Sequence, residues 1–316
     1  MNNQHDVDND DQHRMGDPGL YHYSPLISRP KITWPDNARV AFWVAPNIEF
    51  YELAPPANPV RTPWPRPIPD VLNYAHRDYG NRVGHWRMME VMDAYSVRGS
   101  VSLSLAVCEH HPEIIEACLE RDWELFSHGI YNSRYTYGMS EAQEREMIED
   151  CIESVKRHTG QDLAGWLSPA LTNTPRTLDL LAEFGIHYTC DLFHDDQPQP
   201  VKVKSGRLIS VPYSLEMNDF VVFKRYGATP RAYAEILKRQ FDQLYLEGEH
   251  NAQVMCIPLH PFLIGQPHRI GPFAEALEYI TSHDDVWVTT AREIAAWYYE
   301  HHYDAVLDAL TQGEVR

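Results

Sequence analysis

Short hydrophobic runs alternate with amphipathic stretches along most of the chain. The run Val40-Ala41-Phe42-Trp43-Val44 has no polar position, which is typical of a strand covered on both faces of a parallel sheet. Similar short strands are expected within residues 100–105, 123–126, 163–166, 187–189, 208–211, 254–257 and 286–288. Between them lie segments with apolar residues three or four positions apart, including residues 82–95 and 113–120. Seven or eight such strand-helix units predict one α/β barrel rather than two domains.

Capping residues mark where several of the helices begin. A hydroxyl residue accepts a hydrogen bond from the first turn, and a Gln or Glu three positions later, or a proline directly after it, strengthens the signal. This pattern occurs at Ser140 with Gln143, Thr290 with Glu293, Thr174-Pro175 and Thr229-Pro230. Residues 54–69 contain seven prolines, so this segment is expected to be an extended loop.

Charge and composition narrow the range of partners. The 45 acidic residues outnumber the 27 basic ones, giving a formal charge of -18. This excess argues against nucleic-acid and membrane partners, which bind through Lys and Arg. Residues 1–20 form an acidic tail that we expect to be disordered, residues 21–300 the barrel, and residues 301–316 a C-terminal extension. No run approaches the roughly 18 apolar residues of a membrane span, and the first residues lack a signal-peptide pattern, so a cytoplasmic protein is expected.

Polar clusters follow four of the predicted strands. They are Asn47-Ile48-Glu49, Ser127-His128-Gly129-Ile130-Tyr131-Asn132, the segment from Cys190-Asp191 to Asp196, and Leu259-His260-Pro261. The carboxyl ends of parallel strands open onto one face of a barrel, so a carboxylate and two histidines are expected to converge there. Each residue alone has a structural interpretation, because most of the 17 histidines must be solvated or structural. Together they predict a hydrolytic site.

The chemistry of this site follows from the residue types. We assign Glu49 to the activation of water and His260 to the protonation of a leaving nitrogen. Gly129 would let the backbone approach a ligand, and Asn132 would donate to a developing oxyanion. No cofactor is expected. The alternative is a divalent metal such as zinc, with Glu49 and His128 as candidate ligands, but Asn132 stands where a second histidine would complete a pair.

Several stretches of the chain resemble the polysaccharide deacetylase superfamily, and within it the metal-independent allantoinases and cyclic-imide hydrolases. They occur in the family's order from Tyr21 to Tyr298, and they are Asn47-Ile48-Glu49, residues 78–87, Ser127-His128-Gly129, residues 165–169, residues 211–219 and residues 259–269. The resemblance implies a distorted (β/α)7-type barrel with its site at the carboxyl ends of the strands. It also implies a homotetramer, for which Trp297-Tyr298-Tyr299 is a candidate interface.

The resemblance favours hydrolysis of a carbon-nitrogen bond in a small cyclic amide, ureide or imide. Glu49, His128 and His260 are then the catalytic residues. The expected substrate-binding residues are Asn47, Arg82, Trp86, Tyr131, Asn132, Arg134, Trp166, Ser168, Asp191, Asn218 and Phe262. Two alternatives stay open. One is a metal-dependent N-deacetylase of an acetylated sugar or amine, and the other is a non-catalytic protein that binds a small molecule.

Overall fold

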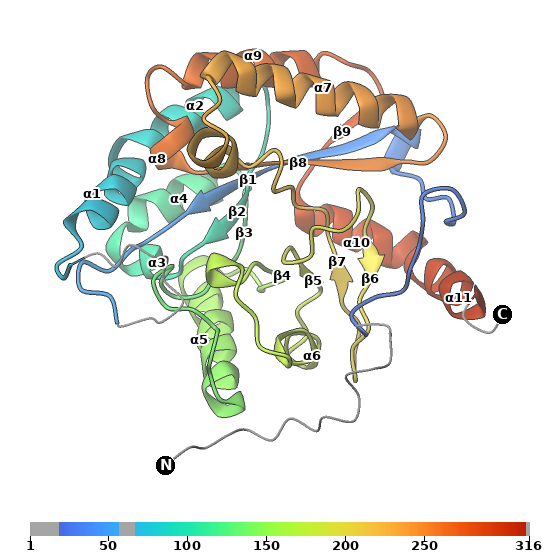
Figure 1. Cartoon of the computed structure of the whole chain (residues 1–316), viewed down its shortest axis with the longest axis horizontal. Helices are drawn as coiled ribbons and strands as arrows, with labels where there is room; N and C mark the ends of the chain where they lie inside the picture. The colour runs from blue at the N-terminus through green and yellow to red at the C-terminus, as the bar shows by residue number, and fades with distance from the viewer. Residues whose placement is uncertain (1–18, 57–66, 314–316) are drawn as a thin grey trace.

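A curled sheet of nine strands forms the centre of the fold in the computed structural model, which describes residues 19–56 and 67–313 (Figure 1). The strands are β1 (Val40–Ile48), β2 (Ser100–Leu103), β3 (Glu124–Ser127), β4 (Gly165–Trp166), β5 (Tyr188–Thr189), β6 (Gln199–Pro200), β7 (Ile209–Ser210), β8 (Gln253–Leu259) and β9 (Val286–Val288). Their order is β6-β7-β5-β4-β3-β2-β1-β8, with β9 also paired to β1. Only the pairing of β6 with β7 is antiparallel, so the carboxyl ends of the other strands share one face.

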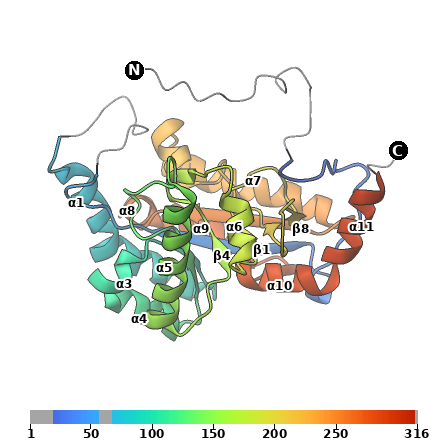
Figure 2. The ribbon, with the colours of Figure 1, turned by 90° about the horizontal axis from the view of Figure 1, so that it is seen from below.

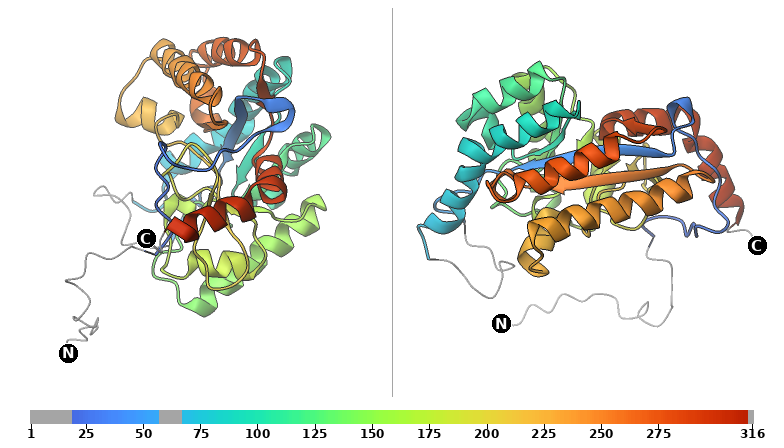
Figure 3. Two further views of the ribbon diagram at one scale, coloured as in Figure 1. Left: turned by 90° about the vertical axis from the view of Figure 1, so that its right-hand side faces the viewer. Right: turned by 90° about the horizontal axis from the view of Figure 1, so that it is seen from above.

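Helices pack around this sheet through one apolar face each. They are α1 (Val71–Tyr79), α2 (His85–Ala94), α3 (Ala106–His110), α4 (Pro112–Glu120), α5 (Glu141–Thr159), α6 (Thr177–Glu183), α7 (Pro230–Gly248), α8 (Pro261–Ile264), α9 (Ile270–Thr281), α10 (Ala291–His301) and α11 (Tyr303–Gly313). On α7 the buried residues Tyr233, Leu237, Phe241 and Leu244 recur every three or four positions, which places them on one face. Figure 3 shows α7 and α9 side by side next to β8, and Figure 2 shows α5 and α6 on another side of the sheet.

Strand β1 is buried along its whole length and has three partners. It pairs with β8 from Val40 to Pro46. Because β8 occupies one edge of β1, the pairings with β9 at residues 40–42 and with β2 at residues 47–48 must share the other edge. Strand β9 therefore fills the amino-terminal end of that edge and β2 the carboxyl-terminal end. This splitting distorts the barrel, and it leaves Asn47 and Glu49 at the end that β2 and β8 frame.

The predicted α/β class and barrel-like curvature are confirmed, with differences in detail. The sheet has nine strands rather than about seven, and no ladder joins β6 to β8 within the described ranges, so the curl forms a half-barrel. The acidic tail predicted at residues 1–20 lies almost wholly outside the described residues. Residues 57–66 of the proline-rich segment also lie outside them. The C-terminal extension contains α11, whose Tyr303 and Val306 are buried in the core. Within the described part of the chain, no helix has the length and hydrophobicity needed to cross a membrane.

Two of the expected helices differ in detail from the structure. The helix expected at residues 82–95 is α2, His85–Ala94, and it is preceded by α1, which was not predicted and begins at Val71, where the side chain of Asp70 accepts a hydrogen bond from the Asn73 backbone directly after the last proline. The helix expected at Pro175 begins at Thr177, after a turn in which the Thr174 hydroxyl accepts from the Arg176 backbone N–H at 3.1 Å and donates to the buried carboxylate of Glu144 at 2.7 Å. The caps at Ser140, Thr229 and Thr290 are confirmed.

Between α1 and α2 the chain makes a π-helical turn, Gly80–Gly84, that packs against α8. A Cβ atom on Gly84 would lie only 2.0 Å from the carbonyl oxygen of Pro261, so this contact requires glycine. The close approach fixes α1 beside α8 and therefore beside His260, which directly precedes α8.

His85 on α2 is fully buried, and neither of its ring nitrogens has a hydrogen-bond partner in the described structure. Its ring packs edge-on against Trp86 and Trp123. Burial, assisted by the charge of Arg121, lowers the pKa of His85 from 6.5 to about 4. The unfolded chain therefore binds more protons than the folded chain between these two values, and the free energy of unfolding should fall as the pH falls through this window.

We expect His85→Leu to remove this pH dependence. The histidine should account for a loss of roughly 2 kcal/mol of unfolding free energy between pH 7 and pH 5, because one pKa unit corresponds to about 1.4 kcal/mol. Urea unfolding of the wild type and the variant at both pH values measures the difference. His268→Leu, which changes an exposed histidine, is the matched control. An equal loss in the wild type and His85→Leu would show that His85 does not cause it.

Candidate active site

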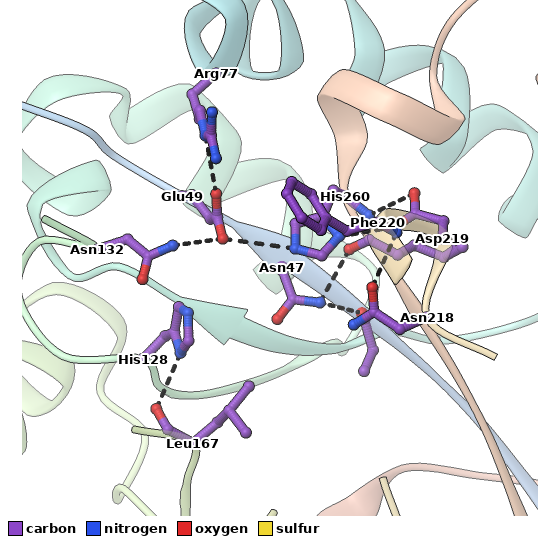
Figure 4. A network of polar contacts seen from close by, with 12 residues as sticks. Asn47, Glu49, Arg77, His128, Asn132, Leu167, Asn218, Asp219, Phe220 and His260 are labelled. Carbon is purple, nitrogen blue, oxygen red and sulfur yellow. Dashed lines mark hydrogen bonds and ion pairs between the residues drawn. The ribbon is translucent and has the colours of Figure 1, made fainter. Parts of the chain in front are cut away.

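Glu49 lies at the centre of the polar residues that follow the strands (Figure 4). It comes directly after β1, two positions from Asn47, so both side chains point to the same side of the strand. Its Oε1 atom accepts a hydrogen bond from Asn132 Nδ2 at 2.5 Å and lies 3.6 Å from His260 Nε2. Its Oε2 atom lies 3.4 Å from Arg77 Nε. The structure thus brings together residues that follow β1, β3 and β8 with a residue of α1.

The charges around Glu49 hold it ionised. Burial alone would raise the pKa of Glu49, but the hydrogen bond and charge of His260, and then the charges of Arg77 and His128, lower it to about 2. A carboxylate with such a low pKa is a poor proton acceptor. Its negative charge is available instead to stabilise positive charge on either imidazole.

His260 lies between two carboxylates. Its Nδ1 atom is 2.7 Å from Asp219 Oδ1, and its backbone N–H donates to Asp219 Oδ2 at 2.9 Å. Burial would lower the pKa of His260, but Asp219 and then Glu49 outweigh it and raise the pKa to about 9. At neutral pH His260 is therefore an imidazolium, and its Nε2 atom faces Glu49 (Figure 4).

His128 is in the opposite protonation state. Its Nδ1 atom lies 3.0 Å from the carbonyl oxygen of Leu167, which can only accept, so Nδ1 carries the hydrogen. In the neutral ring Nε2 then has a lone pair. Burial, the largest effect, lowers the pKa of His128 below its usual value, although the charge of Glu49 acts to raise it. One buried imidazole is thus a proton donor and the other a proton acceptor.

Arg77 is held rigidly beside Glu49. Its guanidinium carbon lies 4.1 Å from the ring centroid of Tyr51 and 4.7 Å from that of Phe262. Its Nη1 atom donates to Asn73 Oδ1 at 2.9 Å. The predicted residue Phe262 also packs edge-on against His260, with ring centroids 5.4 Å apart. The two aromatic rings therefore fix the cation and one wall of the site.

The amides of Asn47 and Asn218 are engaged within the protein. Asn47 Nδ2 contacts the Tyr213 hydroxyl at 2.9 Å and the Leu259 carbonyl at 3.1 Å. Asn218 Nδ2 lies 3.4 Å from the same hydroxyl, and its Oδ1 accepts from the Phe220 backbone. These contacts join the ends of β1, β7 and β8, and they give both amides a structural role alongside the substrate contact predicted for them.

Tyr131 and Arg134 form a separate cluster next to the site. Arg134 Nη2 lies 2.8 Å from Glu52 Oε1, and its guanidinium stacks over the Tyr131 ring at 4.5 Å. Ser133 Oγ also donates to Glu52, at 2.6 Å. Because Glu52 follows Glu49 by three residues, this cluster adjoins the segment that carries the central carboxylate.

Trp166, Ser168 and Asp191 are buried together at the ends of β4 and β5. The Trp166 indole donates to Ser168 Oγ at 3.0 Å, and Ser168 donates to Asp191 through both its hydroxyl and its backbone N–H, each at 2.7 Å. Leu167, between Trp166 and Ser168, accepts the hydrogen bond from His128. The hydrogen bonds on either side of Leu167 therefore help to hold the carbonyl group that binds His128 Nδ1.

Three sequence-based assignments need correction. The Arg82 side chain is 73% exposed and lies 3.7 Å from Asp78, so it points to solvent and away from Glu49. Trp86 is partly exposed on α2 and packs against His85, so it forms no wall of the site described above. Gly129 approaches protein and not a ligand, because a Cβ atom there would lie 2.4 Å from the Pro169 ring.

Arg77, Asp219 and Tyr213 were not predicted as site residues. The sequence offered a weak signal for each, since Asp219 and Tyr213 lie within the resembling stretch 211–219 and Arg77 directly precedes the stretch 78–87. Nothing in residue type alone distinguishes Arg77 from Arg82. Only the packing of α1 against α8 decides which arginine reaches Glu49.

The donor set at this site does not suit a zinc ion. Glu49 receives a hydrogen bond from an amide N–H and faces two cations, Arg77 and the protonated His260. Asn132 directs its N–H toward Glu49, and an amide oxygen is in any case a poor zinc ligand. Of the two imidazoles, only that of His128 has the free lone pair that zinc requires. Within residues 19–56 and 67–313, no three His, Cys, Asp or Glu side chains are grouped as a metal centre would need.

Comparisons with known proteins agree with this architecture. The family model for polysaccharide deacetylase matches residues 75–189. A Schizosaccharomyces pombe protein, whose name assigns it provisionally to the polysaccharide deacetylases, is 27% identical over 89% of this chain and 96% of its own. A crystal structure of a probable polysaccharide deacetylase from Pseudomonas aeruginosa superposes with a TM-score of 0.78 at 28% identity, over 86% of this chain and 95% of that one. The PuuE allantoinase structure gives the same score and identity, over 87% and 95% of the two chains.

Proposed function

From the premise that the chain contains a polysaccharide deacetylase domain, whose family is hydrolytic, we propose that it hydrolyses a carbon-nitrogen bond in a small cyclic amide, ureide or imide. The observation that carries this proposal is the pair of buried imidazoles in opposite protonation states on either side of Glu49. Two titratable groups whose environments separate their pKa values are suited to acid and base roles in one reaction. The similarity to PuuE allantoinase supports a ring as the substrate.

In this mechanism His128 Nε2 takes a proton from water as the water oxygen bonds to the substrate carbonyl carbon. The tetrahedral intermediate then loses its ring nitrogen, and the C–N bond breaks as His260 Nε2 gives its proton to that nitrogen. The product is a ring-opened acid. His128 leaves the reaction protonated and His260 neutral, and exchange with solvent restores both. Glu49, to which the sequence assigned the activation of water, acts indirectly by stabilising positive charge on His128 and His260.

The burial of the central polar residues supports a compact substrate. Glu49, His128, Asn132 and His260 are each at most 8% exposed. A single amide ring can be surrounded by such residues, whereas an extended polysaccharide needs an open groove. The second candidate function, N-deacetylation of an acetylated sugar or amine, is favoured by the names of the S. pombe and P. aeruginosa relatives.

Metal removal separates these two functions. We expect the full-length protein, after treatment with a chelator, to open the ring of at least one of allantoin, hydantoin, succinimide and dihydrouracil, at a rate that added zinc does not raise. Acetate release from N-acetylglucosamine oligomers, assayed with and without zinc, tests the alternative deacetylase function. Zinc-dependent acetate release with no ring opening would overturn the proposed function. Binding of a cyclic amide with no turnover would favour the non-catalytic alternative.

A further inference from the structure

Asn132 is held in one orientation beside Glu49. Its backbone N–H donates to the Phe50 carbonyl at 3.2 Å, and its Nδ2 donates to Glu49 Oε1. Rotating the amide by half a turn would place its oxygen against the carboxylate, where two acceptors repel each other. The position of Glu49 therefore fixes the direction of the Asn132 oxygen.

The oxygen of this amide has no donor in the described structure. Asn132 is only 4% exposed, and Oδ1 is buried without a hydrogen-bond partner. Figure 4 shows this oxygen on the side of Asn132 that faces His128. Leaving a buried acceptor unpaired costs about 1–3 kcal/mol. Such an atom is explained if a ligand supplies the missing hydrogen.

The neighbouring atom of His128 is also an acceptor. Because Nδ1 carries the hydrogen that bonds to Leu167, the lone pair of Nε2 lies on the opposite side of the ring, toward Asn132 and Glu49. Two acceptors thus border the same space with no hydrogen between them. A ring N–H of a cyclic imide offers a single hydrogen, whereas a water molecule offers two.

We propose that Asn132 Oδ1 and His128 Nε2 together hold the nucleophilic water, each accepting one of its hydrogens. Asn132 is then a positioning residue rather than the oxyanion donor expected from the sequence. With both hydrogens bound, a lone pair of the water oxygen is directed away from the two residues, toward the substrate carbonyl. This inference rests on the proposed function, since it assigns the position of the nucleophilic water in that reaction.

His128 and Asn132 also determine where the proton lies after the water has attacked the carbonyl carbon. When His128 has taken the proton, its Nε2–H becomes a donor, and Asn132 is the side chain whose hydrogen bond favours this protonated ring. The remaining hydrogen of the water leaves with the product carboxyl group. Asn132 therefore accepts a hydrogen from water at the start of the step and favours the protonated ring of His128 at its end.

Substitutions at position 132 test this arrangement. We expect Asn132→Leu to lower kcat by about 10²-fold with succinimide or hydantoin and to change KM by less than about 3-fold, because the misplaced group is water and not substrate. Asn132→Asp should recover much of this activity at low pH. A protonated aspartate can donate to Glu49 and still accept from water, and repulsion by Glu49 raises the pKa of such a carboxyl group.

The pH dependence of Asn132→Asp gives a readout that a purely structural role would not produce. We expect its kcat, relative to that of the wild type, to fall with rising pH toward that of Asn132→Leu. Equal losses in both variants at every pH, or a raised KM with unchanged kcat, would overturn the inference. Asn132→Ala replaces Asn132→Leu if a thermal melt shows that leucine prevents folding. Wild-type protein that opens none of the four rings would contradict the proposed function itself. An active wild type with an unimpaired Asn132→Leu variant would contradict only the position that we propose for the nucleophilic water.

Discussion

Replacing His260 with glutamine is expected to lower kcat for ring opening by about 10²–10⁴-fold, the range that a positioned general acid contributes. Glutamine can hydrogen-bond to Asp219 and Glu49 but cannot transfer a proton to the leaving nitrogen. In the wild type the imidazolium is ready for this transfer, because Asp219 at 2.7 Å and Glu49 at 3.6 Å raise its pKa to about 9. Steady-state rates of the purified protein with succinimide and hydantoin measure the loss.

The size of this loss should depend on the leaving group. An imide nitrogen departs as a weaker base than a simple amide nitrogen, so it needs less help from an acid. We therefore expect His260→Gln to be less impaired with succinimide than with a simple lactam such as 2-pyrrolidinone. His250→Gln, which changes an exposed histidine between α7 and the start of β8, is the control. A uniform loss across all substrates would assign His260 to binding or folding instead of proton donation.

Local sequence signals predicted most of the framework. The caps at Ser140, Thr229 and Thr290 depend on residues within one turn, so no distant part of the chain is needed to read them. At Thr174 the hydroxyl accepts from the Arg176 backbone N–H as expected, but it also donates to Glu144, 30 residues away, and the helix begins only at Thr177. A capping pattern in the sequence cannot show that a distant residue also bonds to the capping side chain.

The convergence of Glu49, His128 and His260 was predictable for a geometric reason. Each follows a strand of one parallel sheet, so their ends meet whatever the details of the helices. The residues that tune them were less accessible. Asp219 lies in the segment after β7 and Arg77 on α1, and their proximity to His260 and Glu49 depends on loop paths and on the packing of the Gly84 turn against Pro261.

The roles of these residues were harder to predict than their positions. Residue type made Glu49 the natural base and Asn132 a natural donor. In the structure His260 and Arg77 outweigh burial and lower the pKa of Glu49 to about 2, and the Asn132 N–H is already bonded to this carboxylate. Protonation state and amide orientation depend on contacts between distant segments, and no sequence pattern specifies these.

Asp219→Asn should change the pH profile of the reaction more than any other substitution near the site. Asp219 is the largest influence that raises the pKa of His260 against the effect of its burial. Without that negative charge burial prevails, and the pKa of His260 should fall from about 9 toward or below its usual 6.5. Because His260 must be protonated to act as the acid, activity on the alkaline side is lost as the pH rises through this pKa.

For the wild type we therefore expect kcat/KM to remain high from near neutral pH up to about pH 9 and to decline above it. In Asp219→Asn the decline should begin about 2 units lower, so the variant is impaired by about 10²-fold at pH 8.5 and much less at pH 6. Asp242→Asn, which changes a surface carboxylate on α7 bonded to Tyr279, is the matched control. An alkaline limb that stays in place in Asp219→Asn, with a loss that is equal at all pH values, would mean that His260 is not the acid. The Asp219–His260 pair would then be a structural contact at the end of β8.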